Sequence, residues 1–331
     1  MLKIVNRRPA LQSYIPEAPS GIRGCVRRPG CLETGGWTVG KGRMNRRQFF
    51  GKVGKIGGAM VLGSVAGKAF AGEWEQGLAG LWSGGSFRQD CIDISREAEG
   101  VVRGRIDGSW REFPTIDLPD AFMQWNLQAR LEVLDSIADM MRGGQGSGPS
   151  LAGPHNAAMA TYGGARRDSS FTVNNAFKGV GLCPARDRVA GLIQTMRDTG
   201  DASMPERLQV LHDLYSDTAN FDLTRLVSLE LYSTPDFETH TFLNITENPS
   251  TSLVFLDSTS YEVRGLAELV DPSDAEAPQY SRDIMTYTNL AHSYFHGEFP
   301  RLFPAIVVHV TQVFDNSPGT GLGVRIAPPL P

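Results

Sequence analysis

The stretch from residue 250 to residue 270 constrains the fold more than any other part of the sequence. Residues 252–256 form a short apolar run rich in strand-forming side chains, and a polar cluster at 257–260 follows it. Residues 261–270 then alternate, with Tyr261, Val263, Gly265, Ala267 and Leu269 on one face. Two β-type runs joined by four polar residues predict a hairpin whose second strand is half buried.

A second pattern lies just before this hairpin. Residues 237–243 predict a strand, and residues 244–247 predict a short polar helical turn. Pro249 closes the turn, because the residue before a proline is disfavoured in the α region.

The order of these pieces resembles the FMN-binding split barrel of the pyridoxamine 5′-phosphate oxidase-like superfamily. Its members often carry a turn of the form F-x-N-hydrophobic-x-x-N-P, then a strand of the form S-L-hydrophobic-F-hydrophobic-D, then a strand containing G-x-A. The matching positions here are Phe242, Asn244, Ile245, Asn248, Pro249, residues 252–257 and residues 263–268. An unrelated antiparallel meander would give a similar pattern and stays an open alternative.

The resemblance implies an α+β protein: an antiparallel split β-barrel with flanking helices, preceded by a mainly helical N-terminal region. Periodicity elsewhere suits this architecture. Apolar spacing of three to four residues predicts helices over 120–142, 187–198, 204–215 and 274–296. Alternation predicts strands over 223–233 and 304–315. Residues 101–108 predict one short strand that ends in a turn, and the tail 316–331 reads as irregular.

The N-terminal part has the composition of an export leader. Residues 1–71 hold 13 Lys and Arg against 2 Asp and Glu. Arg46 and Arg47 precede paired phenylalanines, and a glycine-rich, weakly apolar stretch ends in a small-x-small cleavage site at residues 69–71. This pattern resembles a twin-arginine signal and predicts a periplasmic protein without a stable membrane anchor after cleavage.

The chain divides into four predicted parts. Residues 1–43 form a probable mis-annotated or disordered extension, and residues 44–71 form the signal. Residues 72–164 form the N-terminal region and a Gly-rich linker over 143–164, and residues 165–331 form the FMN-binding split-barrel domain. The 260 residues after the signal carry 19 basic and 34 acidic side chains. This acidic body argues against nucleic-acid binding, which needs a basic face.

The resemblance also implies a flavin phosphate site near the end of the strand predicted over 237–243. Many relatives place a lysine seven residues before the Asn of the Asn-Pro pair, but Thr241 occupies that position here. The mature chain has a single lysine, Lys178, so the cation is expected to be an arginine, with Arg301 as a further choice. The cofactor-binding residues that we predict are Thr239, His240, Thr241, Asn244, Arg225 and Arg264.

Several of these side chains have structural interpretations as well. His240 is read either as a hydrogen-bonded barrel histidine or as a ligand contact near a flavin. Asn244 is read either as a cap of the short turn or as a ligand contact. His292 and His296 share a helix face and could hold a metal, but no HExxH pattern supports this and no metal site is predicted.

These observations lead to a working hypothesis and two alternatives. The hypothesis is an exported, homodimeric FMN protein of the oxidoreductase type, in which the flavin performs the redox step. One alternative is a cofactor-free split-barrel binding module. The other is a haem-binding split barrel with His240, His292 or His296 as axial ligand. Cys91 and Cys183, the two cysteines after the signal, are open to pairing or to separate burial.

Overall fold

The fold comes from a computed structural model, which describes residues 80–145, 150, 152–165, 169–297, 299, 301–319 and 321–330. The expected extension at 1–43 and the expected signal at 44–71 lie outside these residues. Within the described part of the chain, no helix has the length and apolar character needed to span a bilayer.

The central hairpin is confirmed. β10 (Ser250–Phe255) and β11 (Tyr261–Val270) pair antiparallel, with Leu253 opposite Val263. The register with the next strand shifts between Arg264 and Gly265, and a Cβ at Gly265 would lie 2.1 Å from the carbonyl oxygen of His309. Only glycine therefore allows this close approach of two backbones at the bulge.

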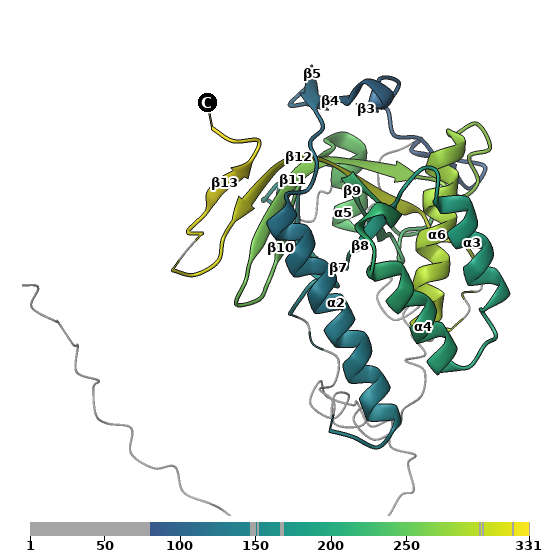
Figure 1. Cartoon of the computed structure of the whole chain (residues 1–331). Helices are drawn as coiled ribbons and strands as arrows, with labels where there is room; N and C mark the ends of the chain where they lie inside the picture. Colours follow the sequence, from purple (N-terminus) through teal and green to yellow (C-terminus); the bar gives the residue numbers. More distant parts are fainter. Residues whose placement is uncertain are drawn as a thin grey trace, which may run out of the picture. The chain divides into compact units, whose positions relative to one another are not determined.

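The hairpin lies at the centre of a curled antiparallel sheet (Figure 1). The strand order is β7-β6-β10-β11-β12-β9-β8, and β13 pairs with β12. Val180 alone separates β7 from β8, yet these two strands lie at opposite ends of that order. One bent strand therefore links the two edges, and the sheet curls into a half-barrel. The strands not yet bounded are β6 (Asn156–Tyr162), β7 (Val173–Gly179), β8 (Gly181–Pro184), β9 (Phe221–Leu229), β12 (Ala305–Asp315) and β13 (Val324–Ala327).

The long helices have the positions that periodicity predicts. They are α2 (Asp120–Met141), α3 (Val189–Asp198), α4 (Met204–Tyr215) and α6 (Gln279–His296). α3 packs on α6 and α2 packs on α4 (Figure 1). Phe122 of α2 is fully buried against the rings of Phe255 and Tyr261, which ties this helix to the central hairpin. The protein is thus α+β, with helices flanking the curled sheet.

The described part of the N-terminal region is only partly helical. β1 (Trp82–Ser83) and β2 (Ser86–Phe87) form a small hairpin. β3 (Ile92–Asp93), β4 (Val101–Ile106) and β5 (Ser109–Pro114) form a three-stranded sheet ahead of α2. The short strand predicted within 101–108 is β4, and β5 was missed.

Three local predictions were wrong. The segment predicted as a strand over 237–243 instead leads into helix α5 (His240–Glu247). The segment predicted as a linker over 143–164 contains β6, which pairs with both β7 and β10. The tail predicted as irregular contains the short strand β13. β6 contains Asn and three Ala, which are infrequent in strands, so its pairing with β7 and β10 determines its structure, whereas the Thr239 cap starts α5.

Candidate ligand-binding site

An open cavity of about 290 Å³ lies where β7 meets the start of α5. We call it the α5 pocket. Its walls are Asn174 and Ala176 of β7, Phe237 of the preceding turn, and Thr239, His240 and Thr241 at the start of α5. Three of the six predicted site residues therefore line one cavity, although they belong to a helix and not to a strand.

Thr239 fixes the start of α5. Its hydroxyl oxygen accepts a hydrogen bond from the backbone N–H of Phe242 at 3.1 Å, which is the geometry of an N-cap. The backbone N–H of Thr239 itself donates to Ser233 Oγ at 3.1 Å. The pocket wall therefore includes a capped helix N-terminus, where the helix dipole favours negative charge.

Thr241 and Asn244 attach α5 to the sheet behind the pocket. Asn174 Nδ2 donates to the Thr241 hydroxyl at 3.0 Å, and Asn244 Nδ2 donates to the hydroxyl of Thr161 at 3.2 Å. Both residues are nearly completely buried. Asn244 lies in the middle of α5, so it does not cap a turn, and it supports the wall that Thr241 lines.

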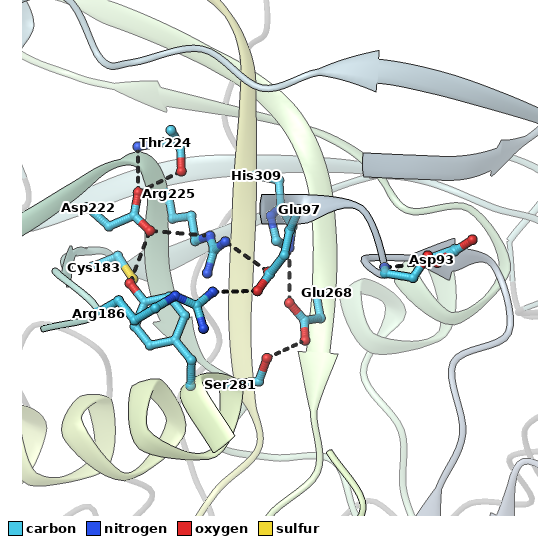
Figure 2. A network of polar contacts seen from close by, with 12 residues as sticks. Asp93, Glu97, Cys183, Arg186, Asp222, Thr224, Arg225, Glu268, Ser281 and His309 are labelled. Atoms are coloured by element: carbon cyan, nitrogen blue, oxygen red, sulfur yellow. Dashed lines mark hydrogen bonds and ion pairs between the residues drawn. The ribbon is translucent and has the colours of Figure 1, made fainter. Parts of the chain in front are cut away.

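Arg225 lies away from the α5 pocket, in the buried network of Figure 2. Its guanidinium donates to Glu97 Oε2 at 2.8 Å and lies 3.5 Å from Asp222 Oδ2. Arg186 donates to the other oxygen of Glu97 at 2.6 Å, and both guanidiniums stack on the ring of Tyr280. Burial lowers the pKa of Arg225, but the two carboxylates outweigh it and raise the pKa overall.

The partners of Arg225 explain what it does. Glu97 belongs to the short 3-10 helix between β3 and β4, whereas Arg225 belongs to β9 of the curled sheet. The ion pair therefore fastens the N-terminal three-stranded sheet to the half-barrel, and we call this group of residues the Arg225 clamp. The structure does not bring Arg225 together with the pocket residues.

A second buried pair lies beside the Arg225 clamp (Figure 2). His309 Nε2 lies 2.9 Å from Glu268 Oε2, and the hydroxyl of Ser281 donates to the other oxygen of Glu268. His309 is fully buried and pairs in register with Arg225 across β12 and β9. These groups join α6 to the sheet, and no sequence motif indicates them.

Arg264 is likewise engaged elsewhere. It is half exposed on β11, its Nε bonds Glu262 Oε1 at 2.6 Å, and its guanidinium stacks on the ring of Phe314. Arg301, the further choice, stacks on Phe303. Of the residues lining the α5 pocket in the described structure, none is a lysine or arginine.

Lys178, which is not among the predicted site residues, lies on β7 one inward position beyond Ala176. Its ammonium is 2.7 Å from Glu230 Oε2, with Lys178 and Glu230 both buried. The hydroxyl of Ser233 lies 3.2 Å from the other carboxylate oxygen of Glu230. Lys178 was dismissed because it lies 63 residues from Thr241 in sequence, and only the β7 pairing, which had no strand signal, places it near α5.

An apolar surface lies on the outward face of β6 and β7. Tyr162 pairs with Val173, and Phe177 follows on the same face of β7. All three are exposed, as is Phe237 at the pocket wall. Exposed apolar side chains gathered on one sheet face are typical of an interaction surface.

The remaining sequence candidates lie apart from the pocket. Cys91 and Cys183 are both free and buried, which decides between pairing and separate burial. Burial raises the pKa of Cys91 to about 11 and raises that of Cys183 further. His292 stacks on Phe299, and the side chain of His296 lies outside the described structure.

Comparison with known proteins adds one similarity. No family model and no curated protein matches the chain. A 1.70 Å crystal structure of HupZ from Group A Streptococcus matches with a TM-score of 0.29 and 16% identity, over 52% of this chain and 94% of that chain. This TM-score is too low to carry an argument. The curled antiparallel sheet is therefore established by the strand pairing of this chain itself.

Proposed function

We propose that this chain is a ligand-binding split-barrel protein and that FMN binds in the α5 pocket. The observation that supports this most is that the sequence resemblance and the cavity point to the same residues. Thr239, His240 and Thr241 were selected from a sequence resemblance to flavin proteins, and the same three residues line a cavity at a helix N-terminus.

The pocket residues offer separate contacts for the phosphate and for the ring of FMN. The hydroxyls of Thr239 and Thr241 and the start of α5 can hold phosphate oxygens, because helix N-termini favour anions. Phe237 and Ala176 offer an apolar surface to a ring. The arginines expected to pair with the phosphate are engaged elsewhere, so charge neutralisation must come from another residue.

FMN, when bound, supplies one- and two-electron redox chemistry, so an oxidoreductase is the activity that follows from this proposal. His240 is the titratable side chain on the pocket wall and can hold or move a proton at its imidazole. Thr239 and Thr241 orient the ligand by hydrogen bonds.

The direct test is titration of the purified protein with FMN, followed by flavin fluorescence and calorimetry. Saturable binding with one FMN per chain supports the proposal. Absence of flavin binding at FMN concentrations up to the micromolar range would contradict the proposal. The cofactor-free binding module would then be the remaining interpretation.

Haem is a second candidate, because His240 lines the pocket next to the ring of Phe237. An imidazole beside an apolar wall is a common axial ligand arrangement. Titration with haemin should then give a shifted Soret band, and His240→Ala should abolish the shift. A Soret shift that survives His240→Ala excludes axial ligation by this histidine.

We also propose a homodimer formed through the outward face of β6 and β7. Tyr162, Val173 and Phe177 form an exposed apolar surface on that face, which a second copy would cover. Light scattering should give twice the chain mass, and Phe177→Asp should halve it. An unchanged mass for Phe177→Asp excludes this face.

Export by the twin-arginine route to the periplasm completes the proposal. Its test is fractionation of cells expressing the full chain, with Arg46→Lys and Arg47→Lys combined as the variant. Retention of the double variant in the cytoplasm is the expected result, and periplasmic delivery of both proteins would contradict it.

A further inference from the structure

We infer that Lys178 is the cation that makes the α5 pocket select an anionic ligand over its neutral counterpart, and that Glu230 holds its ammonium until the ligand binds. This inference rests on the proposed function and names the residue that recognises the negative charge of the ligand. It concerns a residue that neither the sequence pattern nor the pocket lining includes.

The strand geometry places Lys178 beside the cavity. Asn174, Ala176 and Lys178 alternate along β7, and each pairs with an inward residue of β6: Thr161, Met159 and Ala157 respectively. Successive residues on one face of a strand are about 6.6 Å apart, so Lys178 is one such step from Ala176 of the pocket wall. The residue between Asn174 and Lys178 on this face is Ala176, whose side chain is a single methyl group.

A chain of polar contacts joins Lys178 to the opposite wall of the pocket. The ammonium of Lys178 contacts Glu230 Oε2 at 2.7 Å, and Glu230 Oε1 lies 3.2 Å from Ser233 Oγ. Ser233 Oγ accepts the backbone N–H of Thr239, the N-cap of α5. One carboxylate and one hydroxyl therefore separate the ammonium from the pocket wall.

The ion pair is suited to exchange. An entering phosphate would replace the carboxylate of Glu230 as the oxyanion partner of Lys178, so the ammonium would pass from one oxyanion to another without becoming unpaired. Glu230 would keep the backbone N–H of Tyr232 and the hydroxyl of Ser233 as donors. Lysine suits such an exchange, because its ammonium is a point charge on a flexible stem.

The experiment compares FMN with riboflavin, which has the same ring and lacks the phosphate. Affinities are measured by fluorescence quenching for the wild type, Glu230→Gln, and the double variant Lys178→Met with Glu230→Gln. Removing only Lys178 would leave a buried carboxylate unpaired, so the double variant is used to preserve the fold. Arg264→Met is the matched control, since it removes a cation outside the pocket.

The FMN-to-riboflavin affinity ratio should change in opposite directions in the two variants. Glu230→Gln removes the competing carboxylate and should raise the FMN-to-riboflavin affinity ratio by about threefold or more. The double variant should lower this ratio by about tenfold or more while riboflavin affinity stays near that of the wild type. Arg264→Met should leave the ratio unchanged.

Three other outcomes overturn the inference in distinguishable ways. If the double variant keeps the wild-type ratio, Lys178 does not recognise the phosphate, although FMN binding itself stands. If both ligands weaken equally, the ion pair acts on the fold and not on charge selection. If the wild type binds neither ligand, the proposed function fails and this inference fails with it.

Discussion

The Lys178–Glu230 pair and the Arg225 clamp are both buried ion pairs, but they differ in their surroundings. Arg225 contacts two carboxylates and an aromatic ring, and its pair joins two separate sheets. Lys178 contacts one carboxylate, and its pair lies next to a cavity. We interpret the cation that has several partners inside the packed structure as stabilising the fold. The cation that has one partner beside a cavity is free to exchange that partner for a ligand.

The largest expected effect concerns the Arg225 clamp. Arg225→Met leaves the carboxylates of Glu97 and Asp222 buried with fewer partners, so the free energy of unfolding should fall by about 3–5 kcal/mol. Urea unfolding measures this loss. FMN affinity of the folded fraction should stay unchanged, because the clamp lies away from the pocket.

Arg264→Met is the matched control for that variant. Arg264 is half exposed, and exposed ion pairs contribute about 1 kcal/mol or less. A loss of stability in Arg225→Met no larger than in Arg264→Met would show that the clamp does not hold the two sheets together.

The next effect is a pH dependence of stability that arises at His155. Burial, reinforced by the charge of Arg130, lowers the pKa of His155 to about 3. The unfolded chain takes up this proton below about 6.5, whereas the folded chain does not. Stability should therefore fall by about 1.4 kcal/mol per pH unit as the pH drops below 6.5 toward 3.

The contact behind this prediction is local. Arg130 Nη1 donates to His155 Nδ1 at 3.0 Å, and Nη2 donates to the carbonyl of Val180, the residue that joins β7 to β8. His155→Gln should reduce the acid slope of the unfolding free energy, with His212→Gln on α4 as the control. Equal acid slopes for His155→Gln and the wild type would rule this histidine out as the cause.

A smaller effect on stability is expected from removing a helix N-cap, and we compare the cap at the pocket with a cap on another helix. Thr239→Ala and Ser203→Ala each remove an N-cap hydroxyl, from α5 and α4 respectively, and each should cost about 1 kcal/mol of stability. Only Thr239→Ala should also weaken FMN binding, because Ser203 is not a pocket residue. Weakening of equal size in both variants would assign the effect to general stability.

The smallest effect concerns the cysteines. Burial raises the pKa of Cys91 to about 11, so little thiolate forms at neutral pH. Iodoacetamide should leave both Cys91 and Cys183 unmodified in the folded protein and label both in urea, as read by mass spectrometry. Rapid labelling of either cysteine without denaturant would contradict their burial.

The sequence predicted the parts of the fold that carry strong periodicity. The alternation in residues 261–270 identified β11, and the spacing of apolar residues identified α2 within one residue at its end. These patterns predict the elements correctly because each element buries one face against the core. The prediction failed at residues 237–243, which were expected to form a strand, because the Thr239 cap starts a helix at His240.

The pocket was half predicted for the same reason. Thr239 and His240 lie in a local motif and were found, whereas Asn174 and Ala176 lie on a strand rich in Asn and Ala, which strands disfavour. β7 forms because it pairs with β6, and that long-range pairing has no local signal. Arg225 lies apart from the pocket, paired with Glu97, and no local pattern indicates this partner because it lies 128 residues away in sequence.

Blocking the α5 pocket tests the central claim most directly. Ala176→Phe places a ring in the cavity, while Asn175→Phe places the same ring on the exposed outward face of the same strand. FMN titration should show at least a tenfold loss of affinity for Ala176→Phe, about 1.4 kcal/mol, and little change for Asn175→Phe. FMN binding of wild-type strength in a folded Ala176→Phe protein would show that the ligand site lies elsewhere.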